Sequence, residues 1–91
     1  MLNENYYLWV FESKNHAILA FNLLESSGYT DFQIVSTPCG IKSGCTYSIK
    51  FFNHDYLRVV DRTISGLNLF ETRIFYVDNT GGQSRYKEVI Y

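Results

Sequence analysis

The chain has 91 residues, of which 18% are aromatic and 19% are charged, and its formal net charge at pH 7 is −1. This length supports one domain and excludes a second hydrophobic core. Eight basic and nine acidic residues, spread without runs, predict neither a nucleic-acid partner nor a membrane partner. The two cysteines occur without a signal-peptide pattern, so we expect a cytoplasmic protein whose thiols stay reduced.

The first third of the chain predicts a strand, a helix and a second strand. Residues 6–11 are continuously apolar and aromatic, which is typical of a central strand. Ser13 is a candidate N-cap for a helix over residues 14–27, and Gly28 stands where the residue after a helix takes a positive φ. The apolar stripe of this helix comprises Ala17, Ile18, Phe21 and Leu24. Residues 32–36 then have the composition of a strand.

The rest of the chain predicts two more strands around a second helix. Residues 46–51 alternate, with Tyr47, Ile49 and Phe51 on one face and Thr46, Ser48 and Lys50 on the other, as in a half-buried strand. Asn53 is a candidate N-cap for a helix over residues 54–65, which Gly66 would end. Residues 69–77 are rich in strand-forming side chains, and residues 78–82 indicate a turn.

This order of elements predicts a ferredoxin-like β-α-β-β-α-β sandwich, an α+β fold. We expect a four-stranded antiparallel sheet with two helices on one face, formed by residues 1–78 as a single domain. Residues 79–91 would be a turn and a polar tail that could add an edge strand or cross to a partner. In this topology the first and third strands are antiparallel neighbours. The start of the third strand, at Cys45, should therefore lie beside Phe11 and the beginning of the first helix, which carries His16.

Residues 37–45, with the sequence TPCGIKSGC, are the one place where the chain predicts reactive chemistry. They contain the only proline and both cysteines. The sequence has no paired carboxylates, no Ser-His-Asp arrangement and no phosphate-binding loop, so we expect neither a self-sufficient enzyme nor a cofactor. The residues alone do not specify which thiol reaction takes place.

Several segments resemble the selenium/sulfur (Se/S) carrier-like family of small bacterial and archaeal proteins, over roughly residues 6–78. Outside the loop the resemblance involves residues 11–17, Leu23, Leu24 and Gly28. In the loop, the positions that match the family signature are Thr37, Pro38, Ile41, Ser43, Gly44 and Cys45. The chain departs from it at three positions: Cys39 replaces the usual arginine, Lys42 a common serine, and Thr46 a glycine. Lys42 could substitute for the arginine as a point charge.

The resemblance implies a carrier of sulfur or selenium at the persulfide level, with Cys45 as the acceptor thiol. A helix N-terminus and neighbouring cations lower the pKa of a thiol, so His16 and Lys42 are candidates for that role or for holding an anion. Ser43 and Gly44 belong to the same predicted binding loop. Cys39 could attack a Cys45 persulfide as a resolving thiol and leave a disulfide. The expected partners are proteins that donate and accept the chalcogen.

Three other functions remain open from the sequence. An interaction domain could form a homodimer through an aromatic sheet face and carry out no chemistry. A single-stranded nucleic-acid module could stack bases on Tyr7, Trp9, Phe11 and Tyr47, if these face away from the helices. A metal site would have to draw on Cys39, Cys45, His16 and His54, although the topology places His54 at the opposite end of the domain.

Overall fold

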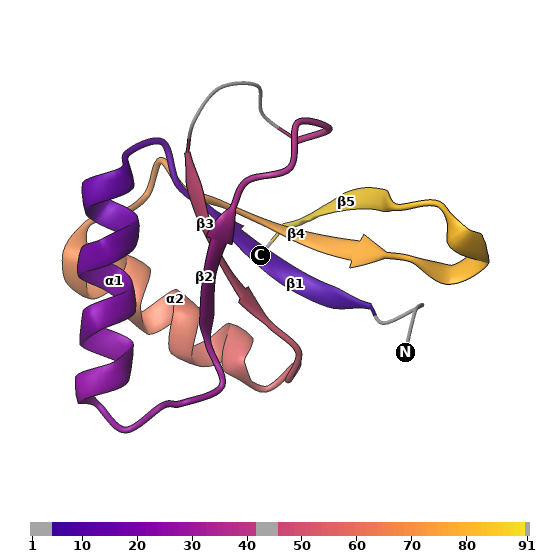
Figure 1. Ribbon diagram of the computed structural model, residues 1–91. Coiled ribbons are helices and arrows are strands. Elements are labelled where there is room, and N and C mark those ends of the chain that lie inside the picture. The colour runs from indigo at the N-terminus through magenta and orange to yellow at the C-terminus, as the bar shows by residue number, and fades with distance from the viewer. Residues whose placement is uncertain (1–4, 42–45, 91) are drawn as a thin grey trace.

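A computed structural model describes residues 5–41 and 46–90 of the chain (Figure 1). Two α-helices and five strands form the described part. The elements in chain order are β1 (Tyr6–Val10), α1 (Lys14–Ser26), β2 (Gln33–Ser36), β3 (Tyr47–Phe51), α2 (Tyr56–Leu67), β4 (Arg73–Asp78), the 3-10 helix η1 (Thr80–Gly82) and β5 (Arg85–Val89).

All five strands belong to one antiparallel sheet with the order β2-β3-β1-β4-β5. The predicted α+β class with two helices and an antiparallel sheet is confirmed, but the prediction of four strands is wrong. β5 pairs with β4 along its whole length, and Asp78 lies opposite Arg85. Gly81 and Gly82, with φ of 86° and 83°, reverse the chain between these strands. The polar composition of β5 left its state open in the sequence.

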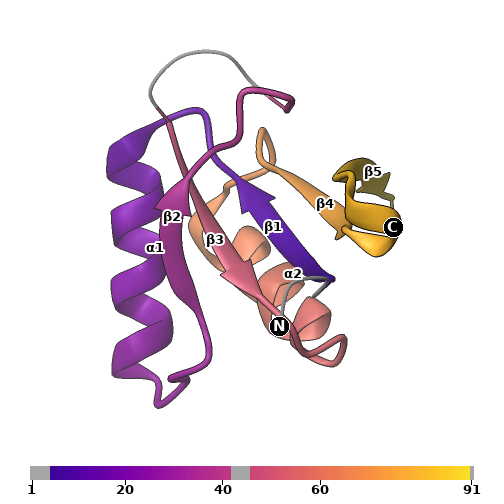
Figure 2. The same cartoon turned by 45° about the vertical axis from the view of Figure 1, so that its right-hand side comes forward.

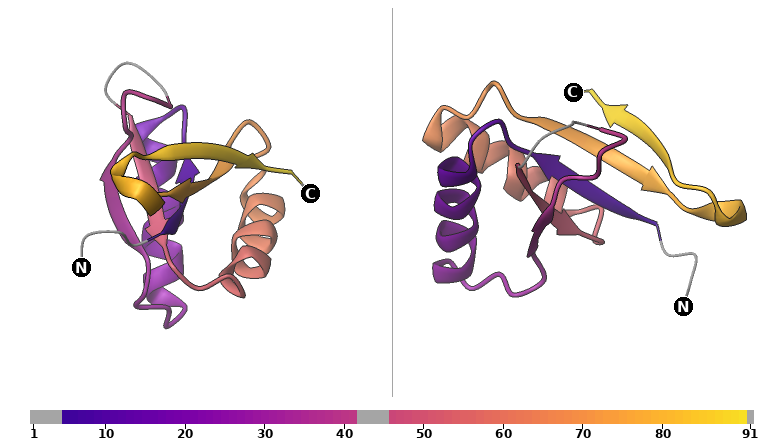
Figure 3. Two further views of the ribbon diagram at one scale, coloured as in Figure 1. Left: turned by 90° about the vertical axis from the view of Figure 1, so that its right-hand side faces the viewer. Right: turned by 45° about the horizontal axis from the view of Figure 1, so that its top comes forward.

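Both helices pack on the same face of the sheet. Trp9, Ile49 and Ile74, which are neighbours on β1, β3 and β4, belong to one buried cluster with residues of both helices. The helices contribute Ala17, Ala20, Leu24, Leu57 and Val60 to this cluster. The predicted alternation of β3 is confirmed, since Tyr47, Ile49 and Phe51 all contact this cluster. In Figures 2 and 3, β5 forms the edge of the sheet that lies farther from α1.

The first helix has the predicted ends but a different buried stripe. Ser13 Oγ accepts a hydrogen bond from the His16 N–H at 3.4 Å, and Gly28 has a φ of 97°. Both observations confirm the predicted caps. Ile18, however, is 42% exposed, and Ala20 completes the buried face. The buried face of α1 therefore consists of Ala17, Ala20 and Leu24.

The second helix and the fourth strand both begin later than predicted. Residues 53–56 form a turn closed by a hydrogen bond from the Tyr56 N–H to the Asn53 carbonyl, and α2 starts at Tyr56. The helix also continues through Gly66, because Asn68 takes the left-handed conformation (φ 56°, ψ 45°) that ends it. Residues 69–72 form a further turn, and the Thr72 hydroxyl accepts a hydrogen bond from Trp9 Nε1 at 2.9 Å.

Two leucines of α1 provide a test of this packing. Leu24 is 2% exposed and Leu19 is 51% exposed. Leu24→Ala should lower the free energy of unfolding by about 2–5 kcal/mol, because it leaves a cavity in the core. Leu19→Ala should change it by less than about 0.5 kcal/mol. Urea unfolding of the two variants measures both values, and equal losses would contradict the described orientation of α1.

Candidate functional site

The base of the loop that contains residues 37–45, here called the thiol loop, is fixed by a backbone bond and a buried side-chain bond. The Thr37 N–H donates to the Thr46 carbonyl at 3.0 Å. The hydroxyls of Thr37 and Ser48 share a hydrogen bond of 2.7 Å, and both residues are buried. A buried hydroxyl pair of this kind is stable because each group satisfies the other. These two bonds join the end of β2 to the beginning of β3.

The first part of the loop is a tight turn that presents Cys39 to solvent. The Ile41 N–H donates to the Pro38 carbonyl at 3.0 Å, which places Cys39 and Gly40 at the two central positions. Cys39 is exposed and its thiol is free. The turn thus presents one of the two predicted thiols where a partner molecule can reach it.

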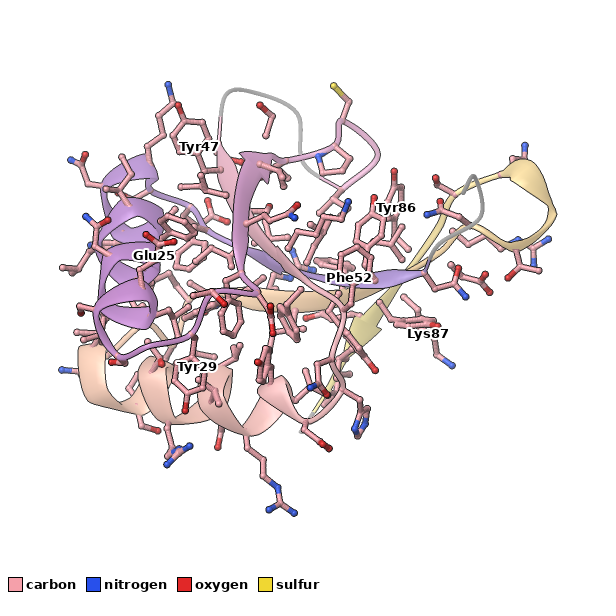
Figure 4. The ribbon with its side chains drawn as sticks, turned by 60° about the horizontal axis from the view of Figure 1, so that its bottom comes forward. Glu25, Tyr29, Tyr47, Phe52, Tyr86 and Lys87 are labelled. Carbon is pink, nitrogen blue, oxygen red and sulfur yellow. The ribbon has the colours of Figure 1, made fainter. Side chains whose placement is uncertain are left out.

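This turn folds over the face of the sheet that the helices leave free. Ile41 and Tyr86 pack against a second buried cluster formed by Leu8, Val10 and Val77. A Cβ atom added at Gly40 would lie 2.7 Å from Tyr86 Cε2, so the ring edge approaches the backbone closely there. In Figure 4 the Tyr86 side chain lies between β5 and the loop. Since β2 and β5 are opposite edges of the sheet, this contact links the two edges across the helix-free face.

The beginning of α1 lies beside the beginning of β3, as the topology predicted. The Phe11 N–H donates to the Tyr47 carbonyl at 3.3 Å. The Nζ atom of Lys14, in the first turn of α1, lies 5.6 Å from the centroid of the Tyr47 ring. The candidate cations predicted from the sequence are His16 and Lys42, and they do not include Lys14. The alternation of β3 turns Tyr47 toward the helices, and this pattern could have indicated that Lys14 lies near its ring.

His16 has a partner in the turn before β4. Its Nδ1 atom lies 3.3 Å from Glu71 Oε2, and the two side chains are 48% and 45% exposed. An exposed pair of this kind contributes little to stability. The carboxylate also attracts the imidazolium whenever His16 is protonated. The predicted action of His16 on Cys45 stays a prediction, because Cys45 lies outside the described residues.

Arg73 is a second cation that sequence reasoning missed. It lies opposite Val10 in the sheet, at the same end as the beginning of α1. Its guanidinium contacts Glu88 twice, through Nε to Oε2 at 3.3 Å and Nη2 to Oε1 at 3.2 Å. These hydrogen bonds and the attraction of the carboxylate raise the pKa of Arg73 above its usual value. Arg73 therefore stays charged and tied to β5.

The remaining predicted site residues fall where the structure gives no description. Lys42, Ser43, Gly44 and Cys45 lie outside the described residues, and their roles stay predictions. Within residues 5–41 and 46–90, no three His, Cys, Asp or Glu side chains form a group that could hold a metal ion. No helix in these ranges is long and apolar enough to cross a membrane.

The aromatic platform proposed for nucleic acid is not on the free face of the sheet. Trp9 and Phe11 are fully buried in the cluster under the helices, and Tyr7 and Tyr47 pack against that same cluster. The nucleic-acid hypothesis required these four rings to face away from the helices, and this condition is not met. The physical reason is the register of β1, whose odd-numbered residues all point to the helix side.

One comparison identifies a family for this chain. Residues 6–74 match the model of the family described as "Putative Se/S carrier protein-like". The chain belongs to this family. The matched region includes the whole thiol loop and the beginning of α1, and it ends at the start of β4, so β5 and Tyr86 lie beyond it. Comparison with curated proteins found no match, and comparison with solved structures found none either.

The hydroxyl pair at the loop base can be tested by a double-mutant cycle. Thr37→Val should lower the free energy of unfolding by about 1–3 kcal/mol, because it leaves the buried Ser48 hydroxyl without its partner. The double variant Thr37→Val, Ser48→Ala should recover most of this loss. Urea denaturation measures the coupling, and additive losses would show that the two hydroxyls do not depend on each other.

The close approach at Gly40 gives a second prediction. Gly40→Ala should destabilise the protein by about 1 kcal/mol, the low end expected for overpacking, because only the Tyr86 ring edge has to move. The loss should disappear in a Tyr86→Ala background. Gly66→Ala is the matched control, since a Cβ there meets nothing within 4 Å. It should stabilise the helix by about 0.5 kcal/mol. A loss at Gly40 that persists without the Tyr86 ring would contradict the contact.

Proposed function

We propose that this protein carries sulfur or selenium at the persulfide level, with Cys45 as the acceptor thiol. The observation that supports it most is the hydrogen bond from the Phe11 N–H to the Tyr47 carbonyl. It brings the strand that follows Cys45 against the chain that enters α1. A helix N-terminus carries partial positive charge, which stabilises a nearby thiolate. Membership of the Se/S carrier-like family supports the same function.

In the loading step the Cys45 thiolate attacks the terminal sulfur of a donor persulfide. The sulfur–sulfur bond of the donor breaks, and a new bond forms between Cys45 Sγ and the transferred sulfur. The donor leaves as a thiolate, so the step needs no external oxidant or reductant. The same reaction transfers selenium when a selenium atom takes the place of the terminal sulfur of the donor.

In the release step an acceptor nucleophile attacks the terminal sulfur, and Cys45 leaves as a thiolate. Cys39 offers a second route, because its thiol is free and exposed on the turn of the same loop. The Cys39 thiolate attacks Cys45 Sγ, the persulfide bond breaks, and hydrosulfide leaves. The product is a Cys39–Cys45 disulfide, which a dithiol reductant must reduce before the next cycle.

The cations that favour the Cys45 thiolate are Lys14 and Lys42. Lys14 lies in the first turn of α1 and contacts Tyr47, which follows Cys45 by two residues. His16 contributes less because Glu71 is its partner at 3.3 Å. Ser43 and Gly44 supply the hydroxyl and the backbone amides of the loop. The partners are the proteins that donate and accept the chalcogen, and a reducing cytoplasmic location keeps both thiols available.

We also propose that the scaffold is a ferredoxin-like sandwich extended by one strand. The first four strands have the spatial order β2-β3-β1-β4, and both helices cover one face. This is the arrangement that two split β-α-β units generate with right-handed crossovers. β5 is then an addition at the edge of β4.

Persulfide loading of the two thiols tests the proposed function. The reduced protein is incubated with a low-molecular-weight persulfide, or with the corresponding selenopersulfide, and its intact mass is measured. Wild type and Cys39→Ser should gain the mass of one chalcogen atom, and Cys45→Ser should not. The alkylation rate of Cys45 should reach half its maximum below pH 7, because the thiol pKa is lowered from about 8.5.

Lys14→Gln provides a control for the electrostatic part of the argument. It should shift the alkylation profile of Cys45 to higher pH, whereas Arg58→Gln, an exposed change on α2, should leave the profile unchanged. Two slowly alkylated thiols with ordinary pH profiles and no adduct would refute the carrier function. The protein would then be an interaction domain without chemistry.

A further inference from the structure

The thiol loop and the C-terminal hairpin come from opposite edges of the sheet and meet over its helix-free face. The loop follows β2 and Tyr86 belongs to β5, the two outer strands of the order β2-β3-β1-β4-β5. Nevertheless, the Gly40 backbone and the Tyr86 ring are in contact, since a Cβ at Gly40 would lie 2.7 Å from Cε2. Ile41 beside it packs against the same cluster as Tyr86.

In residues 37–41, hydrogen bonds support the loop side of the contact at two places. Thr37 is anchored to Ser48 and Thr46, but these bonds hold only the base of the loop. Beyond the base, the turn is closed by the bond from the Ile41 N–H to the Pro38 carbonyl. A surface turn opens easily unless side chains pack against it. Ile41 and Tyr86 provide this packing.

The hairpin that supplies Tyr86 is held firmly enough to act as a fixed support. β5 pairs with β4 over five residues, from Ile74–Val89 to Asp78–Arg85. The two contacts between Arg73 and Glu88 join the same strands near the other end of the hairpin from η1. The ring of Tyr86 therefore projects from a strand that is bonded along its length.

We propose that Tyr86 is a positioning residue that holds the Cys39 turn against the C-terminal hairpin and thereby restrains Cys39 as a resolving thiol. The restraint keeps the turn on the helix-free face of the sheet. The beginning of α1 and Lys14 lie at the opposite face, against which Tyr47 packs. Because Gly40 is next to Cys39, any movement of the turn that brings Cys39 elsewhere must break the contact with the Tyr86 ring. The consequence for chalcogen release depends on the function proposed above, whereas the contact itself does not.

This restraint belongs to a part of the chain outside the family match. The match ends at residue 74, and Tyr86 is twelve residues further along the chain. Cys39 directly precedes Gly40, whose backbone makes the contact with Tyr86. The second thiol and the residue that restrains it are thus linked in space, although they lie 47 positions apart in the sequence.

Amide hydrogen exchange tests the restraint directly. In Tyr86→Ala the exchange of the Ile41 N–H relative to that of Ile49, in the core of β3, should accelerate about fivefold, the effect of roughly 1 kcal/mol of lost contact. Tyr86→Phe keeps the ring and should behave as wild type. Tyr76→Ala removes another tyrosine from the same hairpin, one that packs on Tyr7, and should leave this ratio unchanged. An unchanged ratio in Tyr86→Ala, or an equal change in Tyr76→Ala, would overturn the proposal.

The release rate tests the functional part. Protein loaded with sulfur is freed of excess donor, and hydrosulfide release and disulfide formation are followed by intact mass. Both should be faster by about fivefold in Tyr86→Ala than in wild type or Tyr86→Phe, if the same contact limits Cys39. Faster Ile41 exchange with an unchanged release rate would overturn the restraint on Cys39. A chain that fails to load on Cys45 but shows the exchange effect would refute the carrier function and leave the contact in place.

Discussion

Burial of both faces of β1 is the constraint on which the rest of the structure depends. Trp9 and Phe11 are buried on one side of this central strand, and Leu8 and Val10 are buried on the other. A strand with two apolar faces needs a cover on each, because every exposed apolar side chain forfeits about 1.5–3 kcal/mol of burial. The two helices cover the first face. The second has no helix, so a loop and the C-terminal hairpin cover it. The thiol loop is therefore part of the core as well as the candidate site.

This double role explains why some residues of the loop are packed and others are exposed. Thr37 and Ile41 serve packing and hydrogen bonding, and both are held by neighbours on the sheet. Cys39 lies between them at the exposed tip of the turn. A thiol held at a defined position on the surface can meet a partner without a large loss of conformational entropy. Gly40 supports this arrangement because its missing side chain leaves space for the Tyr86 ring.

Among the described residues, two basic side chains near the site lie beside carboxylates. His16 pairs with Glu71 and Arg73 pairs with Glu88, so their fields are partly neutralised. Lys14 contacts an aromatic ring instead, and an ammonium group above a ring keeps its full charge for an anion nearby. The arrangement therefore favours Lys14 over His16 as the described cation that acts on a thiolate at this end. The role of His16 stays a prediction, because Cys45 lies outside the described residues.

The sequence by itself determined the element types, the cap residues Ser13 and Gly28, the alternation of β3 and the family. These features depend on local spacing and on residue-specific backbone preferences, which a chain carries without its tertiary contacts. The sequence did not determine the ends of α2, where Asn68 and not Gly66 takes the left-handed conformation, nor the state of the polar tail. Only the tertiary structure decided that β5 joins the sheet and that Tyr86 meets Gly40. The physical reason is that both depend on which apolar face remains uncovered after the helices have packed, and no local pattern records that.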